Sequence, residues 1–363
     1  MKYWRGYLTA AILLACTWAL REFAAAHSVL VDMIYPYVTR MAQAFLANWS
    51  SGVDFCLWQG LLLALIALGI ASAVLMIILK WNPIRWGGWI CTVVAVIIFL
   101  NTGLYSLNQF SGPLSEDIRL EETDYTIAEL EKATAYYRDQ ANAFSQQIER
   151  DSRGDVVFAG FEALAEQASV GFEKMVYEES LSVFAGPVEP VKKLGWAGRY
   201  TNQGITGVTV GITGEAAVNP QIPAVMMPFA MCREMARRAS ITIERDASFA
   251  AWMGCSYNDS IQFKYSGALM GYRYCLKALE DLDKVTNAGA AARVLAEESA
   301  QVKHDREICD RFYGNTEMKD GKVCDLLTSW HIQEIVLPTQ VEKENAFDPL
   351  DKSQVDLSDH PYA

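Results

Sequence analysis

The chain has 363 residues, of which 52% are hydrophobic, a high share for a soluble domain. Its formal net charge of -12 at pH 7 argues against a nucleic-acid partner, because nucleic-acid affinity depends on cations that neutralise phosphates. The apolar residues are concentrated before residue 108, and most of the charge lies after it. The composition therefore predicts a membrane protein with a separate polar domain.

Three apolar runs predict a membrane region over residues 1–107. Residues 55–79 and 86–107 carry no charge and are each longer than the roughly 20 helical residues that cross a bilayer core. A shorter run predicts a retained helix over residues 7–31. A cleaved signal peptide ending near residues 24–26 is the alternative.

Positive charge predicts the orientation of these helices. The cations that flank them are Lys2, Arg5, Lys80 and Arg85. Such residues remain on the cytoplasmic side, so the N-terminus is expected to be cytoplasmic and the region after residue 108 extracytoplasmic. The segment 28–54, with Arg40 as its only cation, is expected outside as an amphipathic helix on the membrane surface. Membrane lipid is thus an expected partner.

Residues 108–337 are predicted to form one mostly helical domain. Thr126 and Glu129 have the spacing of a capping box, which predicts a helix from about residue 126 to 150. Apolar residues at three- and four-residue spacing predict further helices over 158–179, 228–255 with a short break, 265–282, 288–312 and 322–335. A glycine-bounded strand or hairpin is predicted at Val208, Thr209, Val210, Gly211 and Ile212. The acidic tail, 338–363, is predicted to be disordered.

The cysteines and histidines give little sign of a metal site. The outer region has no C-x-x-C pair, so a cysteine-based zinc site is not expected. Cys309 and Cys324 are candidates for a disulfide bridge. The four histidines are scattered along the chain and are interpreted as surface or core residues.

One helix carries the spacing of a metal-site motif. Residues 233–237, R-E-M-A-R, match the zinc-protease motif H-E-x-x-H with an arginine at each histidine position. In that motif two histidines on one helix face bind zinc and the glutamate activates the metal-bound water. Glu234 occupies the glutamate position, and Glu244 or Asp246 follows where a third ligand can stand.

The order of several motifs resembles a bacterial membrane-anchored family that is classified as a domain of unknown function. The resemblance spans most of residues 1–335. The matching segments are TGEAAVN at 213–219, PF at 228–229, ERDASF at 244–249, QFKYSGALMGYRYCLKAL at 262–279 and DGKVCDLL at 320–327. The resemblance implies a mainly α fold, in which three N-terminal transmembrane helices precede a mostly helical, zincin-like outer domain with a small β-hairpin.

The sequence departs from the family pattern at the residues that would bind metal. Arg233 and Arg237 replace the two histidines, and Asp246 replaces the second glutamate of E-x-E-A-N-F. A protonated guanidinium has no lone pair for a metal, and its deprotonation near neutral pH costs about 7 kcal/mol per residue. We therefore expect no zinc, no other cofactor and no catalytic residue. The two arginines are predicted to replace the charge of the ion and to pair with Glu234, Glu244 and Asp246. The alternative is an exposed basic helix face.

These residues support three functional hypotheses. The first is a non-catalytic pseudo-metalloprotease with a binding, scaffolding or regulatory role, in which the strand at 208–212 binds a peptide or protein partner by backbone hydrogen bonds. The second is an active membrane-bound zinc metallopeptidase with unusual ligands, Glu244, Asp246 and Cys232, and with Glu234 as its base. The third is a structural subunit of a membrane assembly.

Overall fold

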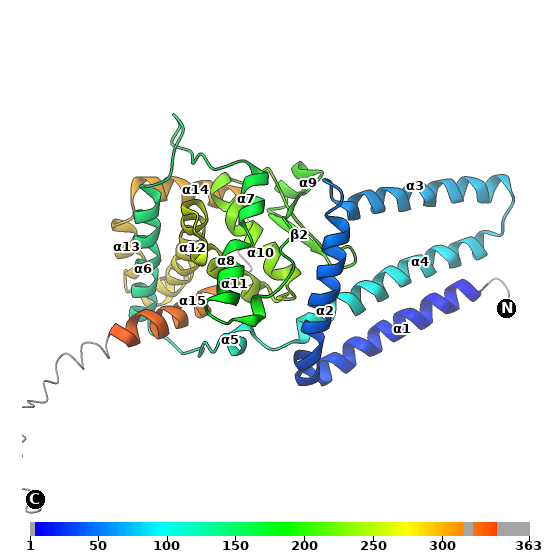
Figure 1. Ribbon diagram of the computed structural model, residues 1–363, viewed down its shortest axis with the longest axis horizontal. Helices are drawn as coiled ribbons and strands as arrows, with labels where there is room; N and C mark the ends of the chain where they lie inside the picture. Colours follow the sequence, from blue (N-terminus) through cyan, green and yellow to red (C-terminus); the bar gives the residue numbers. More distant parts are fainter. Residues whose placement is uncertain (1–3, 315–321, 340–363) are drawn as a thin grey trace, which may run out of the picture.

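Three long helices extend from one end of a mainly helical domain. A computed structural model describes residues 4–314 and 322–339 (Figure 1). Helices α1 (Arg5–Ala26), α3 (Leu57–Ile78) and α4 (Pro83–Leu104) are long and apolar enough to cross a membrane. The prediction of three N-terminal membrane helices ahead of a mostly helical domain is confirmed. The predicted disordered tail lies almost entirely outside the described residues.

The C-terminal boundary predicted for the first helix, residue 31, is wrong. Helix α1 stops at Ala26, and a second helix, α2 (Ser28–Ser50), follows after His27. His27 has φ -126° and ψ 47°, so the backbone leaves the helical conformation at this residue and changes direction. The apolar pattern continues through the turn, which is why it predicted one helix to residue 31. Each of the three membrane-capable helices has one end near the domain. In Figure 1, α2 runs across these three ends.

Close packing of α1 against α4 relies on glycine. A Cβ atom on Gly6 would lie 2.5 Å from the backbone carbon of Gly88, so the two backbones approach more closely than larger residues allow. The Thr92 hydroxyl donates a hydrogen bond to Gly6 O at 2.9 Å. Small residues and hydroxyl groups hold helices together in this way where no water competes.

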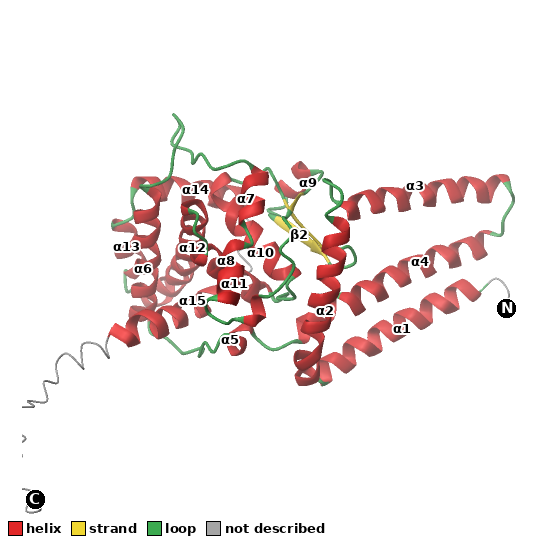
Figure 2. Ribbon diagram, in the orientation of Figure 1, coloured by secondary structure: helices red, strands yellow, loops and turns green. Residues whose placement is uncertain are grey.

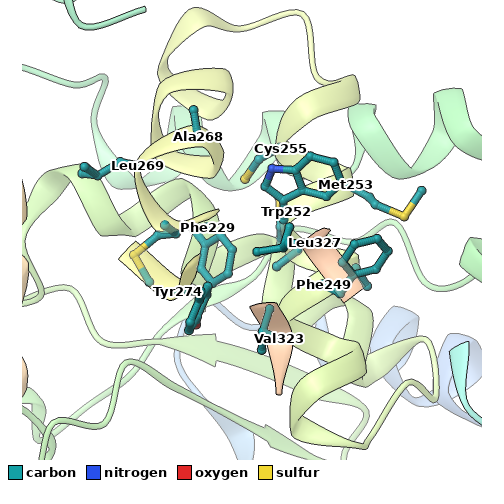
Figure 3. Packing of buried hydrophobic residues seen from close by; sticks show 14 of the residues in the cluster. Phe229, Phe249, Trp252, Met253, Cys255, Ala268, Leu269, Tyr274, Val323 and Leu327 are labelled. Carbon is teal, nitrogen blue, oxygen red and sulfur yellow. The ribbon is translucent and has the colours of Figure 1, made fainter. Parts of the chain in front are cut away.

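The helical domain is built around α12 (Ile261–Thr286), which packs against α6 (Ile127–Ser145), α10 (Met227–Arg238) and α11 (Glu244–Tyr257). The domain also contains α5 (Leu114–Asp117), α7 (Phe161–Gln167), α8 (Val170–Tyr177), α9 (Ala197–Thr201), α13 (Ala290–Ala296), α14 (Ala300–Tyr313) and α15 (Val323–His331). A short 3-10 helix, η1 (Ser106–Phe110), follows α4 and precedes α5. Figure 3 shows buried side chains that join these elements, with Phe229 of α10 beside Tyr274 of α12 at a ring separation of 6.1 Å. The largest hydrophobic cluster contains residues of both α10 and α11 and fixes these helices relative to one another.

Several predicted boundaries change in the structure. The capping box is confirmed, because Glu129 N donates to Thr126 Oγ1 at 3.3 Å and Thr126 N to Glu129 Oε2 at 2.7 Å. However, α6 ends at Ser145 rather than near residue 150. The single helices predicted over 158–179 and 288–312 are each two helices, because a turn breaks an apolar pattern that continues on both sides.

A small three-stranded sheet has the order β1-β3-β2. Strand β2 (Gly207–Val210) pairs antiparallel with β3 (Glu215–Val218), which confirms the predicted hairpin. Gly211 and Ile212 lie in the turn, so the predicted strand extends too far. Strand β1 (Lys192–Lys193) was not predicted, because two residues carry no alternation signal. Figure 2 shows how small the sheet is beside the helices.

The proposed bridge between Cys309 and Cys324 is absent from the structure. Cys309 is a free, buried cysteine, and the loop between the two residues lies partly outside the described range. The Sγ atom of Cys324 lies 3.4 Å from the Tyr125 hydroxyl. Both residues therefore belong to the packed interior of the domain.

A glycine contact that positions α11 provides a test of the fold. A Cβ atom on Gly171 of α8 would overlap the carbonyl oxygen of Gly254 in α11, whereas Gly160 has nothing within 4 Å of its Cβ position. We expect Gly171→Ala to lower the free energy of unfolding by about 1–3 kcal/mol through overpacking. Gly160→Ala, the matched control, should leave the thermal midpoint near the wild-type value. Equal midpoints for the two variants would show that α8 and α11 are not in contact.

Candidate functional site

Helices α10 and α11 meet at a tight turn that brings the predicted site residues together. Helix α10 ends at Arg238, and α11 begins at Glu244. Ser240, in the turn, has φ 77°, a left-handed conformation that favours glycine. Its hydroxyl lies 2.9 Å from the Thr39 hydroxyl of α2. This hydrogen bond helps to hold a backbone conformation that is otherwise unfavourable for serine.

The two arginines contact both predicted glutamates. Arg233 Nη1 lies 3.3 Å from Glu244 Oε1, and Arg233 Nε lies 3.6 Å from Glu234 Oε1. Arg237 Nη1 lies 3.5 Å from Glu234 Oε1, and its Nη2 forms a short hydrogen bond with Glu244 Oε2. Two guanidinium groups therefore face two carboxylates. We call Arg233, Glu234, Arg237 and Glu244 the ion-pair cluster.

Most of the ion-pair cluster is removed from water. Glu234 has 0% of its surface exposed, and Arg233 has 8%. The Glu244 side chain is 41% exposed. The alternative of an exposed basic helix face is therefore wrong for Arg233. Because a buried unpaired charge is strongly unfavourable, the buried charges of the cluster depend on one another.

Strand β2 forms one wall of the cluster. The Thr209 hydroxyl donates to Glu234 Oε2 at 2.9 Å, and Thr206 accepts a short hydrogen bond from Arg233 Nη2. A Cβ atom on Gly207 would lie 2.5 Å from Glu234 Cγ, so glycine allows the strand to approach the helix. Thr206 was missed in the sequence, and Thr209 was predicted as a residue of the strand but not as a partner of Glu234.

Tyr105, just beyond the end of α4, reaches the same region. Its hydroxyl donates to Arg237 O at 3.2 Å, and its ring packs at Gly211 in the hairpin turn. Burial, reinforced by the negative charge of Glu234, raises the pKa of Tyr105 well above its usual value. Tyr105 therefore remains a neutral donor and connects a membrane-capable helix with the ion-pair cluster.

Asp246 and Cys232 have other partners. The Asp246 carboxylate accepts hydrogen bonds from Leu114 N at 3.0 Å and from Arg245 Nε at 3.0 Å. Cys232 Sγ lies 3.8 Å from Ala168 O. Within residues 4–314 and 322–339, no three His, Cys, Asp or Glu side chains converge as a metal site would require.

Glu215 is an important residue that the sequence reasoning missed. It lies in the TGEAAVN segment on β3 and is 2% exposed. Its carboxylate accepts hydrogen bonds from Leu57 N at 2.7 Å and Trp58 N at 2.8 Å, the first amides of α3, and pairs with Lys192 at 2.8 Å. The sequence feature that could have identified Glu215 is a charged residue within an otherwise apolar strand. Glu215 caps the N-terminus of a membrane-capable helix, where the helix dipole favours negative charge.

The architecture defines a membrane protein with a mainly helical domain that closes around a buried ion-pair cluster. Comparison with protein families matches residues 31–327 to the family described as "Protein of unknown function (DUF3810)". The chain belongs to this family. No curated protein and no solved structure matches the chain.

Removing one partner tests whether the cluster stabilises the domain. Glu234→Gln leaves Arg233 and Arg237 without their fully buried counter-charge, so we expect a loss of about 3–5 kcal/mol in the free energy of unfolding. Glu178→Gln, an exposed control, should change it by less than about 0.5 kcal/mol. Thermal unfolding of the purified full-length protein in detergent measures both. A Glu234→Gln variant as stable as the control would contradict the cluster's structural role.

Proposed function

We propose that this chain is a membrane-anchored pseudo-metalloprotease whose zincin-like domain binds a peptide or protein partner and does not hydrolyse it. The ion-pair cluster is the observation that carries the proposal. Arg233 and Arg237 stand at the histidine positions of H-E-x-x-H, and their guanidinium groups contact Glu234, at the base position, and Glu244 on the next helix.

The residues at this site do not fit zinc. A zinc ligand must offer a lone pair, and a guanidinium offers only hydrogen-bond donors. Deprotonating both arginines would cost about 14 kcal/mol, comparable to the roughly 10–16 kcal/mol that a good structural zinc site supplies. The N–H groups of the two arginines also contact the glutamate oxygens that a zinc ion would need as ligands. The arginines thus serve as covalently attached cations in place of the ion.

The membrane topology supports an extracytoplasmic domain. The start of α1 and the loop between α3 and α4 lie at the same end of the molecule, away from the helical domain (Figure 1). Arg5, Lys80 and Arg85 lie at this end, and cations are retained on the cytoplasmic side. In the proposed orientation, the domain lies on the opposite side of the membrane.

Strand β2 is the proposed binding edge. Among the residues that the structure describes, β3 is its only strand partner, because the sheet order is β1-β3-β2. Asn219 N donates to Thr206 O at 2.8 Å, which sets the register of the pair. Antiparallel pairing alternates, so Gly207 and Thr209 direct their backbone groups away from β3. Gly207 is buried and Thr209 is partly exposed, so Thr209 is the accessible position of this edge. An extended peptide adds to such an edge by backbone hydrogen bonds.

An active metallopeptidase is less well supported by the geometry. That hypothesis needs Glu244, Asp246 and Cys232 to converge on one ion. Asp246 instead accepts from Leu114 N, and Cys232 approaches Ala168 O. Glu244 alone of the three lies in the ion-pair cluster.

Restoring the two histidines provides the test. We expect the double variant Arg233→His, Arg237→His to retain close to one zinc per chain after dialysis, because two lone pairs then join Glu244. The wild type should retain almost none. Adding Glu244→Gln to the double variant is the matched control and should reduce the zinc content again. Mass spectrometry of the purified protein measures the metal.

Two results would oppose the proposal. One is wild-type protein that holds zinc near one per chain and loses it when Glu234 or Glu244 is replaced. The other is peptide cleavage by the wild type that a chelator abolishes and that Glu234→Gln eliminates.

A further inference from the structure

Helix α2 carries a continuous apolar face that remains exposed. The large side chains on this face of α2 are each at least half exposed, and Met41 is 76% exposed. They repeat at three- and four-residue spacing, which places them on one side of the helix. The residues that define this apolar face are Met33, Ile34, Tyr37, Met41, Phe45 and Trp49.

The opposite side of α2 is polar and buried against the helical domain. Thr39 lies 2.9 Å from the Ser240 hydroxyl, and Gln43 Nε2 donates to Gly211 O at 2.9 Å. Arg40 Nη1 donates to Ser182 O at 2.9 Å. Residues two positions apart lie about 200° apart around a helix, so Met41 points away from Thr39 and Gln43. This arrangement is the reverse of a surface helix in a soluble protein, which buries its apolar side.

The apolar face of α2 continues from the membrane-capable helices. One residue, His27, separates α2 from α1. Val31 packs with Ala24 of α1 and with Leu107, and the Tyr35 hydroxyl donates to Thr102 O of α4 at 3.0 Å. In Figure 1, α2 lies between the domain and the three helices, across their ends. Its position therefore coincides with the boundary of the bilayer that α1, α3 and α4 would span.

We propose that α2 lies in the plane of the membrane interface, with its apolar face in the lipid and its polar face holding the domain. Lipid is the occupant that the structure favours, because the face begins where membrane helices end. Interfacial helices bury one apolar side near the boundary of headgroups and acyl chains. The aromatic residues Tyr37 and Trp49 suit that boundary.

This placement would fix the ion-pair cluster relative to the bilayer. Thr39 contacts the turn between α10 and α11, and Gln43 contacts the turn between β2 and β3. Both segments that frame the cluster are thus attached to the same helix. A ligand of the β2 edge would then approach along the membrane surface. The lipid contact itself does not depend on the proposed binding function.

Spin labelling of the full chain in phosphatidylcholine vesicles tests the proposal. Cys16 and Cys91 are the exposed cysteines of the described residues and are replaced by alanine; the remaining six are buried. A nitroxide is then attached at Met41→Cys or Phe45→Cys. The control is Val285→Cys, 80% exposed near the C-terminal end of α12. Figure 1 places α13, the next helix, at the end of the domain far from the membrane helices.

The two classes of site should differ in access to relaxation agents. Labels on α2 are expected to collide with oxygen, which dissolves in lipid, and to be shielded from a water-soluble nickel chelate. The label at Val285→Cys should show the reverse. Nickel access on α2 equal to the control would overturn the proposal. Shielding from both agents, with spin–spin coupling between copies, would also overturn it and would assign the face to a second copy of the chain.

Discussion

A guanidinium group can only donate hydrogen bonds, and this constraint governs the centre of the domain. Glu234 is fully buried on α10 and needs positive charge close by. Arg233 and Arg237 provide it from the same helix face and extend to Glu244 on α11. The donors that satisfy the glutamates also join the two helices. Such a buried cluster need not make the fold more stable than an apolar core would, but it makes each member dependent on the others.

The cluster is also connected to the membrane-capable helices. Tyr105 links the end of α4 to the backbone of Arg237, and Glu215 caps α3 from the strand beside β2. Helix α2 contacts the turns on both sides of the cluster. The region therefore contacts the membrane-capable helices through Tyr105 and Glu215, and it contacts α2 through the two turns. In the proposed binding role, a ligand at the β2 edge and the membrane helices would influence the same few residues.

Sequence periodicity predicted the features with strong local signals. The uncharged runs predicted α3 and α4, and the capping box predicted the start of α6. Features that depend on tertiary contacts were harder to predict from the sequence. The turn at His27 interrupts a pattern that stays apolar, and β1 is too short for any alternation. The family resemblance, together with charge, predicted that Arg233 and Arg237 pair with Glu244, and the structure contains these contacts. The predicted pairing with Asp246 was not found. Asp246 instead accepts a hydrogen bond from Leu114 N, a residue more than 100 positions away in the sequence. Glu215 was missed for the same reason, because its partners lie on α3.

Anomalous diffraction at the zinc absorption edge, from crystals grown with zinc, shows whether a zinc ion can bind between α10 and α11. We expect no anomalous peak between α10 and α11, because the guanidinium groups of Arg233 and Arg237 occupy that space beside Glu234 and Glu244. A peak about 2 Å from a carboxylate oxygen of Glu234 or Glu244, the distance of a zinc–oxygen bond, would contradict it.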